Sequence, residues 1–484
     1  MKKNINLFGK TIAVYGLNKT GVAIATSLKQ RGAYIIAWDD NKNAQENASS
    51  KGIFLKNLYD EDFKNVDYLV WSPGISHTIP TPHPIATNAK IAGVEIISDI
   101  EVFMNMFPKN KYIGITGTNG KSTVTGLIHH ILKTNKIETA VGANYGIPVF
   151  ALPELSEKGV YVFELSSYMI ELTPSLNIDC AVLTNMSPDH LDRHKNMDGY
   201  AKIKSQIFNR TDNKSHFNII GIDDKHSAKI YEEVIKNRNT DTTIPVSIKN
   251  SIKGIYVDDD GILKDNFFEK NKKVFDLKKL TNLLGKHNWQ NIAECYAVAC
   301  CYKIPTEKFI IALQSFENLD HRMEKLPMPK YFENITVVND SKGTNADSTK
   351  YALDAYKEIY WIAGGRQKTD GIEPLVKMLK PSKIIRAYMI GEATRPYHKI
   401  AKNKIDSYRC WTMKRAVNKA FKHITHDMKK GIVSHPTLLL SPSATSWDQY
   451  KSFEHRGDEF KKIVADVVAK YTKKYEKKYA KKLV

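Results

Sequence analysis

The feature that most constrains this chain is a glycine-rich turn between a β-branched apolar stretch and a Lys-Ser-Thr sequence, within residues 112–123. This order predicts a strand, a tight turn and a helix start, where backbone N–H groups and the helix N-terminus converge on an anion. Lys121 can then reach the outer phosphates of a nucleotide, and the Ser122 hydroxyl is placed to bind Mg²⁺. The turn consists of Thr116, Gly117, Thr118, Asn119, Gly120, Lys121, Ser122 and Thr123.

The turn is shorter than the standard P-loop, because Ile115 stands five residues before Gly120, where that motif has glycine. A turn that merely joins a strand to a helix is the alternative. Gly-Lys-Ser directly after a strand nevertheless favours a phosphate site.

Length and composition are those of an ordinary globular protein. The 484 residues suggest about three domains, and no apolar run of roughly 18 residues predicts a transmembrane helix. The first residues lack the apolar core of a signal peptide. The five cysteines show neither CxxC spacing nor a paired framework. We therefore expect reduced thiols and a cytoplasmic location. We also expect a monomer.

The formal net charge is +20 and comes mostly from lysines, which are spread along the chain and are most frequent at the C-terminus. Solvated surface lysines explain it most simply, and a positive field would also attract anionic nucleotide substrates. A nucleic-acid-binding P-loop ATPase is an alternative, which predicts strongly salt-dependent binding. Neither zinc-finger spacing nor an RNA-recognition motif accompanies the charge, so we expect no nucleic-acid partner.

The first part of the chain predicts a βαβ unit, with strands at residues 11–15, 34–38 and 66–71 and a helix at about 22–30. Asn18 replaces the middle glycine of G-x-G-x-x-G, so its turn is either a nucleotide site or a helix entry. Asp39 follows the second strand at about the distance of a ribose contact. Ser72, Pro73 and Gly74 follow the third strand.

A strand at residues 160–163 brings Glu164 to its C-terminal end, where ligands bind in open α/β sheets. A carboxylate facing a phosphate loop suits a phosphate-bound Mg²⁺, although an ordinary solvated strand end is the alternative. The next strand, at residues 179–185, leads to His190 and His194. Their i,i+4 spacing raises the question of zinc, but no glutamate follows His190 and no third ligand is evident. We read the polar residues 226–266 as surface hairpins and loops.

The last part predicts another parallel sheet, with strands at residues 335–338, 359–363 and 437–440. Lys368 lies in the glycine-rich loop after the second of these strands, where a cation can meet a substrate carboxylate. Gln367 and Thr369 flank it.

These motifs together resemble the Mur ligase and folylpolyglutamate synthase superfamily. Thr-Gly-Thr-Asn-Gly-Lys-Ser-Thr, Glu-Leu-Ser-Ser, Asn-Met-Ser-Pro-Asp-His-Leu-Asp-Arg-His and Lys204-Ser-Gln-Ile-Phe occur in the order of the Mur ligase central domain. Gly285-Lys-His-Asn-Trp-Gln-Asn is similar to the family's adenine-side stretch. The resemblance reaches to about residue 470.

The resemblance implies ATP and two Mg²⁺ ions. Ser122 and Glu164 would hold one ion, and His190 with a carbamylated lysine would hold or position the second. Lys202 and Lys204 compete for that role, and the family pattern, with this lysine three residues before an Ile-aromatic pair, selects Lys204. The implied ATP contacts are Gly117, Thr118, Asn119, Gly120, Lys121, Ser122, Thr123, Asn288, Arg322 and Asp340; the implied catalytic residues are Lys121, Glu164, His190, Lys204 and Lys342.

The stretch at residues 441–457 resembles the loop of the family branch that adds D-glutamate to UDP-N-acetylmuramoyl-L-alanine. The Asp-Asn-Pro-Arg motif of the diaminoacid-adding branch is absent. Sibling ligases, such as the L-alanine-adding branch or a folylpolyglutamate synthase, are the alternatives within the superfamily. The implied substrate-binding residues are Asn18, Lys19, Thr20, Asp39, Ser72, Pro73, Gly74, Asn144, Ser166, Thr344, Lys368, Ser446 and Phe453.

The resemblance also implies three α/β domains. These are a Rossmann-like UDP-sugar domain at residues 1–108, a central ATP-binding domain with a parallel sheet at 109–317, and a Rossmann-like amino-acid domain at 318–484 that carries a basic tail. Such a chain would be an amide ligase for peptidoglycan precursors that works through an acyl phosphate.

The tail repeats apolar residues every four positions, which a helix would align as one stripe with lysines beside it. These residues are Val467, Tyr471, Tyr475, Tyr479 and Leu483. A basic amphipathic helix on an anionic membrane surface is one interpretation. A helix packed on the third domain and a frayed chain end are the others.

Overall fold

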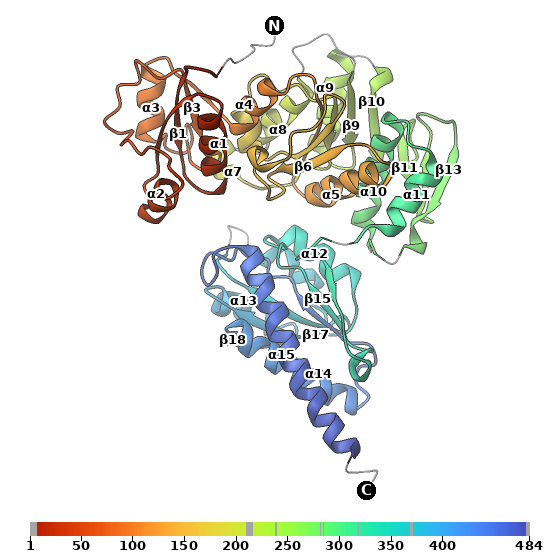
Figure 1. Ribbon diagram of the computed structural model, residues 1–484. Coiled ribbons are helices and arrows are strands. Elements are labelled where there is room, and N and C mark those ends of the chain that lie inside the picture. The colour runs from red at the N-terminus through yellow and green to blue at the C-terminus, as the bar shows by residue number, and fades with distance from the viewer. Residues whose placement is uncertain are drawn as a thin grey trace. The chain divides into compact units, whose positions relative to one another are not determined.

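The computed structural model describes residues 7–209, 216–237, 240–280, 282–283, 285–317, 319–367 and 371–480. Three sheets with helices on their faces form this part of the chain (Figure 1). Contacts divide it into two compact units: Met1–Thr281 with Lys286–Phe316, and Asn282–Gly285 with Glu317–Val484. The mixed α/β class with parallel sheets is confirmed, whereas the domain boundaries remain predictions.

The first sheet has the order β2-β1-β3-β4 and is parallel throughout. Helix α1 begins three residues earlier than predicted because the Asn18 side chain accepts hydrogen bonds from the N–H groups of Thr20 and Gly21 and caps it. The elements are β1 (Thr11–Tyr15), α1 (Lys19–Gln30), β2 (Tyr34–Trp38), α2 (Lys42–Ser49), β3 (Tyr68–Trp71), α3 (Pro84–Ile91), β4 (Glu95–Ile97) and α4 (Asp99–Met106).

The second sheet has the order β13-β12-β11-β10-β9-β8-β5-β7-β6, parallel from β6 to β11 and antiparallel at β12 and β13. Its strands are β5 (Lys111–Thr116), β6 (Thr139–Ala143), β7 (Val160–Glu164), β8 (Cys180–Leu183), β9 (Phe217–Gly221), β10 (Thr243–Ser247), β11 (Ile255–Val257), β12 (Ile262–Asp265) and β13 (Lys272–Asp276). Its helices are α5 (Lys121–Thr134), α6 (Ser167–Glu171), α7 (Leu191–His194), α8 (Met197–Ser205), α9 (Lys225–Asn237), α10 (Lys286–Cys301) and α11 (Thr306–Ser315).

The interpretation of residues 226–266 as surface hairpins and loops was wrong. This segment contains most of α9 and the buried strand β10, which pairs in parallel with β9. Only β11 and β12 form the kind of hairpin that we expected. Polar residues dominate the segment, but the short apolar runs within it are long enough to extend the sheet.

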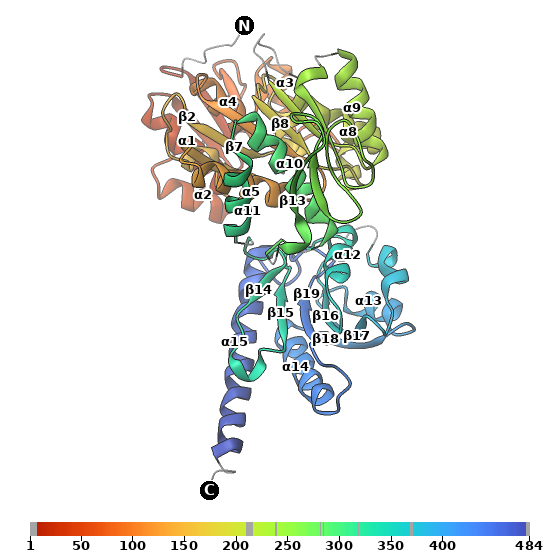
Figure 2. The same ribbon diagram turned by 90° about the vertical axis from the view of Figure 1, so that its right-hand side faces the viewer.

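The third sheet has the order β14-β15-β19-β16-β17-β18, and only β14 is antiparallel. Apolar clusters cover both of its faces. Helix α15 packs along α14 and β15 (Figure 2). The elements are β14 (Glu324–Leu326), β15 (Thr336–Asn339), α12 (Ala346–Ala355), β16 (Ile359–Gly364), β17 (Ile384–Ile390), α13 (Thr394–Ala401), β18 (Asp406–Trp411), α14 (Met413–Lys429), β19 (Thr437–Leu440) and α15 (Phe453–Ala480).

The apolar stripe of the tail is used in packing as far as Tyr471. Val467 is buried in the core of the third sheet, and the Tyr471 ring lies 5.0 Å from that of Phe421. This agrees with the packed-helix interpretation. The side chains of Tyr475, Tyr479 and Leu483 lie outside the described part of the chain. Among the described helices, none is long and apolar enough to cross a membrane.

Candidate active site

The glycine-rich turn joins β5 to α5 in a conformation that only glycine adopts easily. Gly117 has φ +138° and Gly120, the N-cap of α5, has φ +84°. A Cβ atom on Gly117 would lie 2.0 Å from Thr184 Oγ1, and one on Gly120 would lie 2.3 Å from Asn291 Oδ1. The turn is therefore enclosed by the end of β8 and by α10, so the adenine-side stretch predicted around Asn288 lies beside the phosphate loop.

Hydrogen bonds within the protein fix the shape of this turn. Asn185 Oδ1 accepts from the Asn119 N–H at 3.0 Å, and Thr184 Oγ1 donates to the Asn119 carbonyl at 2.6 Å. The ammonium group of Lys121 donates to the Thr118 carbonyl at 2.8 Å. These bonds tie the turn to Thr184 and Asn185 after β8 and to the side chain of Lys121, and so hold its backbone in one conformation.

The hydroxyl group of Ser122, in the first turn of α5, meets the carboxylate of Glu164 at the C-terminal end of β7. The Ser122 hydroxyl donates to the Glu164 carboxylate, and the Asn144 amide donates to its other oxygen at 2.7 Å. Glu164 is 2% exposed. Hydroxyl and carboxylate oxygens are ligands for a hard cation such as Mg²⁺. Within the described residues, no three His, Cys, Asp or Glu side chains group as metal ligands, so phosphate oxygens and water would complete the shell.

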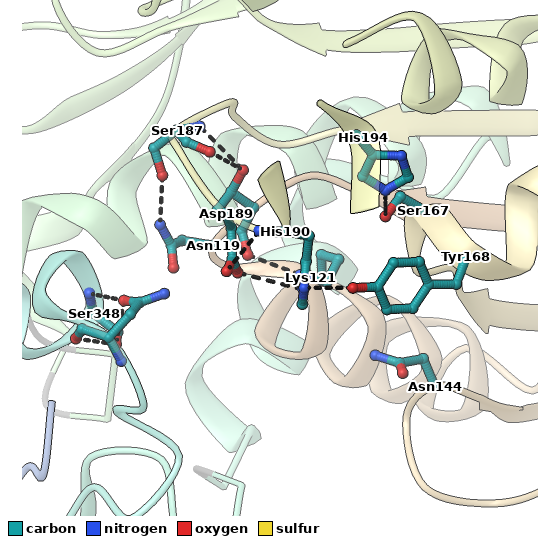
Figure 3. Close-up of polar contacts among 12 residues, drawn as sticks. Asn119, Lys121, Asn144, Ser167, Tyr168, Ser187, Asp189, His190, His194 and Ser348 are labelled. Atoms are coloured by element: carbon teal, nitrogen blue, oxygen red, sulfur yellow. Dashed lines mark hydrogen bonds and ion pairs between the residues drawn. The ribbon is translucent and has the colours of Figure 1, made fainter. Parts of the chain in front are cut away.

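His190 and His194 have separate partners. His190 follows β8 with φ +54°, and its Nδ1 lies 2.8 Å from the Tyr168 hydroxyl (Figure 3). Its Nε2 lies 3.5 Å from the Asp189 carboxylate. His194 is buried, which lowers its pKa, and its Nε2 lies 2.8 Å from the Ser167 hydroxyl. The described residues give these two histidines no shared set of zinc ligands.

Lys204 is 1% exposed, whereas Lys202 on the same helix faces solvent. The Lys204 ammonium donates to Thr116 Oγ1 at 3.0 Å and lies 4.8 Å from the centre of the Tyr200 ring. Burial lowers the pKa of Lys204 well below its usual value, and the charge of Lys121 lowers it further. The buried lysine is therefore the one that faces the phosphate loop.

A cavity of about 330 Å³ brings together ten of the predicted residues of the first two sheets. Of the phosphate loop it is lined by Lys121 alone, and neither Ser122 nor Glu164 lines it. Lys19 and Asp39 do not line it; Asp39 instead accepts a hydrogen bond from the Leu17 N–H at 2.6 Å. Tyr168 and Tyr200 also line it, although neither was predicted as a site residue. The lining residues are Asn18, Thr20, Ser72, Pro73, Gly74, Lys121, Asn144, Ser166, Ser167, Tyr168, Met169, Asp189, His190, Tyr200 and Lys204.

The second unit gathers its own candidates after β15 and β19. Asp340 is 7% exposed and accepts a hydrogen bond from the Ser441 hydroxyl at 2.7 Å. The Lys342 ammonium lies 3.8 Å from the centre of the Phe453 ring. Thr344 donates its N–H to the Lys342 carbonyl, Ser446 is buried, and Arg322 is partly exposed. Lys368 lies outside the described residues.

Arg456 was not predicted as a site residue, yet it joins two of these loops. It is fully buried, and burial lowers its pKa to about 10. Its Nε and Nη2 donate to the Ser341 hydroxyl and carbonyl at 3.0 and 2.8 Å, and its Nη1 donates to the Ala444 carbonyl at 3.0 Å. A single guanidinium thus fixes the loop of Lys342 to the loop of Ser446.

The buried Asp340 predicts a pH-dependent stability. Burial raises its pKa to about 7, whereas in the unfolded chain it ionises near pH 4. Between these values the folded protein binds a proton that the unfolded chain has lost, so this group's contribution to the free energy of unfolding falls as pH rises through that window. As the pH rises from 4 to 8, we expect the free energy of unfolding of Asp340→Asn to increase, relative to that of wild type, by up to about 4 kcal/mol.

Urea unfolding of both proteins across that pH range measures this difference. A constant difference between wild type and Asp340→Asn would show that the carboxyl ionises alike in the folded and unfolded states.

Comparisons with known proteins agree with this arrangement. Residues 115–299 match the Mur ligase middle domain. The UDP-N-acetylmuramoylalanine–D-glutamate ligase of Rhodospirillum rubrum is 39% identical over 475 residues, which cover 96% of this chain and 97% of the relative. The ligase of the same name from Agrobacterium fabrum is 36% identical over 462 residues, covering 94% and 95%.

Solved structures share the fold. UDP-N-acetylmuramate–alanine ligase MurC of Thermotoga maritima superposes with a TM-score of 0.59 at 16% identity, covering 96% of this chain and 99% of that one. MurF ligase from the same organism, solved with ADP, gives a TM-score of 0.57 at 16% identity, covering 97% and 98%. With the sequence relatives, these findings confirm the resemblance: the chain belongs to the Mur ligase family, among relatives named UDP-N-acetylmuramoylalanine–D-glutamate ligase.

Proposed function

We propose that this enzyme uses ATP to join D-glutamate to UDP-N-acetylmuramoyl-L-alanine in peptidoglycan precursor synthesis. The observation that carries an ATP-dependent ligation is the cavity where the phosphate-loop lysine meets the C-terminal ends of the first sheet. A nucleotide phosphate and the end of a substrate held by that sheet can meet there. The choice of D-glutamate rests on the relatives that carry this name.

The reaction must bring together two anions, the alanyl carboxylate and the γ-phosphate. A carboxylate oxygen attacks phosphorus, the bond to ADP breaks, and an acyl phosphate forms. The amine of D-glutamate then attacks the acyl carbon, loses a proton, and inorganic phosphate leaves. The charge of Lys121 in the phosphate loop would offset the repulsion in the first step.

The metal ligands that we propose are Ser122 and Glu164 for one Mg²⁺, with His190 and a carbamylated Lys204 for a second. Bound Mg²⁺ would stabilise charge on the phosphate oxygens. Lys204 suits carbamylation because its buried amine loses its proton easily. The neutral nitrogen adds to the carbon of CO₂ and releases one proton, which leaves an oxygen anion that suits a hard cation.

The D-glutamate pocket that we propose combines Thr344, Lys368, Ser446 and Phe453, with Lys342 above the Phe453 ring. The UDP-sugar would contact Asn18, Lys19, Thr20, Asp39, Ser72, Pro73, Gly74, Asn144 and Ser166. We further propose that the domain boundaries lie at residues 108 and 317, that the protein is a monomer and that it is cytoplasmic. The free state of all five cysteines suits a reducing compartment.

Phosphate release with defined substrates tests the function. With ATP and UDP-N-acetylmuramoyl-L-alanine, we expect D-glutamate to stimulate phosphate release far more than L-alanine, L-lysine or diaminopimelate, because a tailored polar pocket discriminates strongly. Stimulation by L-alanine with UDP-N-acetylmuramate, and none by D-glutamate, would identify the L-alanine-adding sibling instead.

A further inference from the structure

The positive charge of this protein is concentrated in one part of the chain. Residues 317–484 contain 34 Lys and Arg against 19 Asp and Glu, so they carry 15 of the 20 net positive charges. Few of these cations belong to the proposed ligation site. The remaining cations either have another function or are surface residues without a specific function.

Helix α14 (Met413–Lys429) presents many of these charges on one face. Its buried residues, Met413, Ala416, Val417, Ala420, Phe421, Ile424 and Asp427, pack on the third sheet. Its one acidic residue, Asp427, is buried and forms an ion pair with Arg386 at 2.8 Å. The exposed side chains that define the α14 basic face are Lys414, Arg415, Lys419, Lys422, Lys429 and the following Lys430.

Acidic groups do not offset this face. In the described ranges, no carboxylate lies in ion-pair contact with any of its six cations; Lys419 instead lies 4.1 Å from the centre of the Tyr408 ring. That contact links the face to β18, the edge strand of the sheet. Exposed Lys402, Lys404 and Arg409 continue the charge along this edge.

Two exposed apolar side chains flank the α14 basic face. Trp411 is 38% exposed just before the helix, and Ile432 is 56% exposed just after it. Tryptophan is favoured at membrane–water interfaces, and clusters of four to eight Lys and Arg on an amphipathic helix attract anionic lipid headgroups. Single-stranded nucleic acid would call for a row of exposed stacking aromatics beside the cations, whereas beside α14 Trp411 is exposed and Tyr408 is only partly so.

We infer that the α14 basic face binds the surface of an anionic phospholipid bilayer. The face lies within the second unit, and none of the proposed site residues belongs to α14. The binding that we infer therefore depends on neither D-glutamate nor ATP.

The test is co-sedimentation of the full-length protein with vesicles of phosphatidylcholine containing about 30% phosphatidylglycerol, at about 50 mM salt. The triple variant Lys414→Glu/Lys422→Glu/Lys429→Glu should bind at least about a hundredfold more weakly, on the order expected for the loss of three cations near the surface. Lys236→Glu/Lys253→Glu/Lys270→Glu is the matched control, because it makes the same change in net charge at exposed lysines of the first unit. It should bind like wild type.

Unchanged ligase turnover without vesicles shows that both variants are folded. Equal binding by wild type and the α14 variant overturns the inference, and so does an equal loss in the control, which would make net charge the cause. Tighter binding to a single-stranded RNA homopolymer than to the vesicles, lost in the α14 variant, would assign the face to nucleic acid instead.

Discussion

Replacing Lys121 by alanine is expected to reduce ATP-dependent ligation by about a thousandfold or more. The phosphate loop places this ammonium group at the N-terminus of α5, where its Nζ already contacts the Thr118 carbonyl of the turn. Loss of one donor aimed at developing charge typically costs two to three powers of ten, or about 4 kcal/mol of transition-state stabilisation. Single-turnover phosphate release measures the effect.

Lys133→Ala is the matched control, because Lys133 lies in the last turn of the same helix and faces solvent. It should keep wild-type turnover. Both variants should keep the wild-type melting temperature, since the Lys121 side chain is not part of the apolar core. A folded Lys121→Ala protein with wild-type turnover would contradict the phosphate role.

The sequence alone could place the phosphate loop and Glu164 at strand ends and His190 in the loop after the next strand, whereas their roles remain predictions. Parallel strands end at one edge of their sheet, so residues at those positions must lie close together. The same reasoning placed Ser72, Pro73 and Gly74 at the cavity.

The sequence could not predict in the same way which side chains are buried and which groups they hydrogen-bond. Lys202 and Lys204 are two positions apart on a polar helix, and only tertiary packing decides which one is buried. Arg456 was not predicted as a site residue, because its three hydrogen bonds depend on how two loops pack around it. Asp39 has the sequence spacing from the first glycine turn that is typical of a ribose contact. Its carboxylate nevertheless accepts a hydrogen bond from the Leu17 N–H, and it does not line the cavity.

Replacing Lys204 by alanine is expected to leave almost no ligation, with partial recovery when acetate or formate is added. A buried amine beside a second ammonium group is unfavourable as a cation. As a carbamate it would instead supply oxygens to the proposed metal site, and a small carboxylate diffusing into the emptied space could replace them. Lys202→Ala is the control, because that side chain is exposed, and it should behave like wild type.

Recovery by carboxylates separates the carbamate from a structural role. If Lys204 only supports the fold through its bond to Thr116, Lys204→Ala should melt at a lower temperature and neither acetate nor formate should restore turnover. If it is carbamylated, ¹³CO₂ should give a carbamate resonance in wild type and Lys202→Ala but not in Lys204→Ala. The absence of that resonance in wild type would contradict the carbamate proposal. If Lys204 instead acts as a cation, alkylamines rather than carboxylates should restore the turnover of Lys204→Ala.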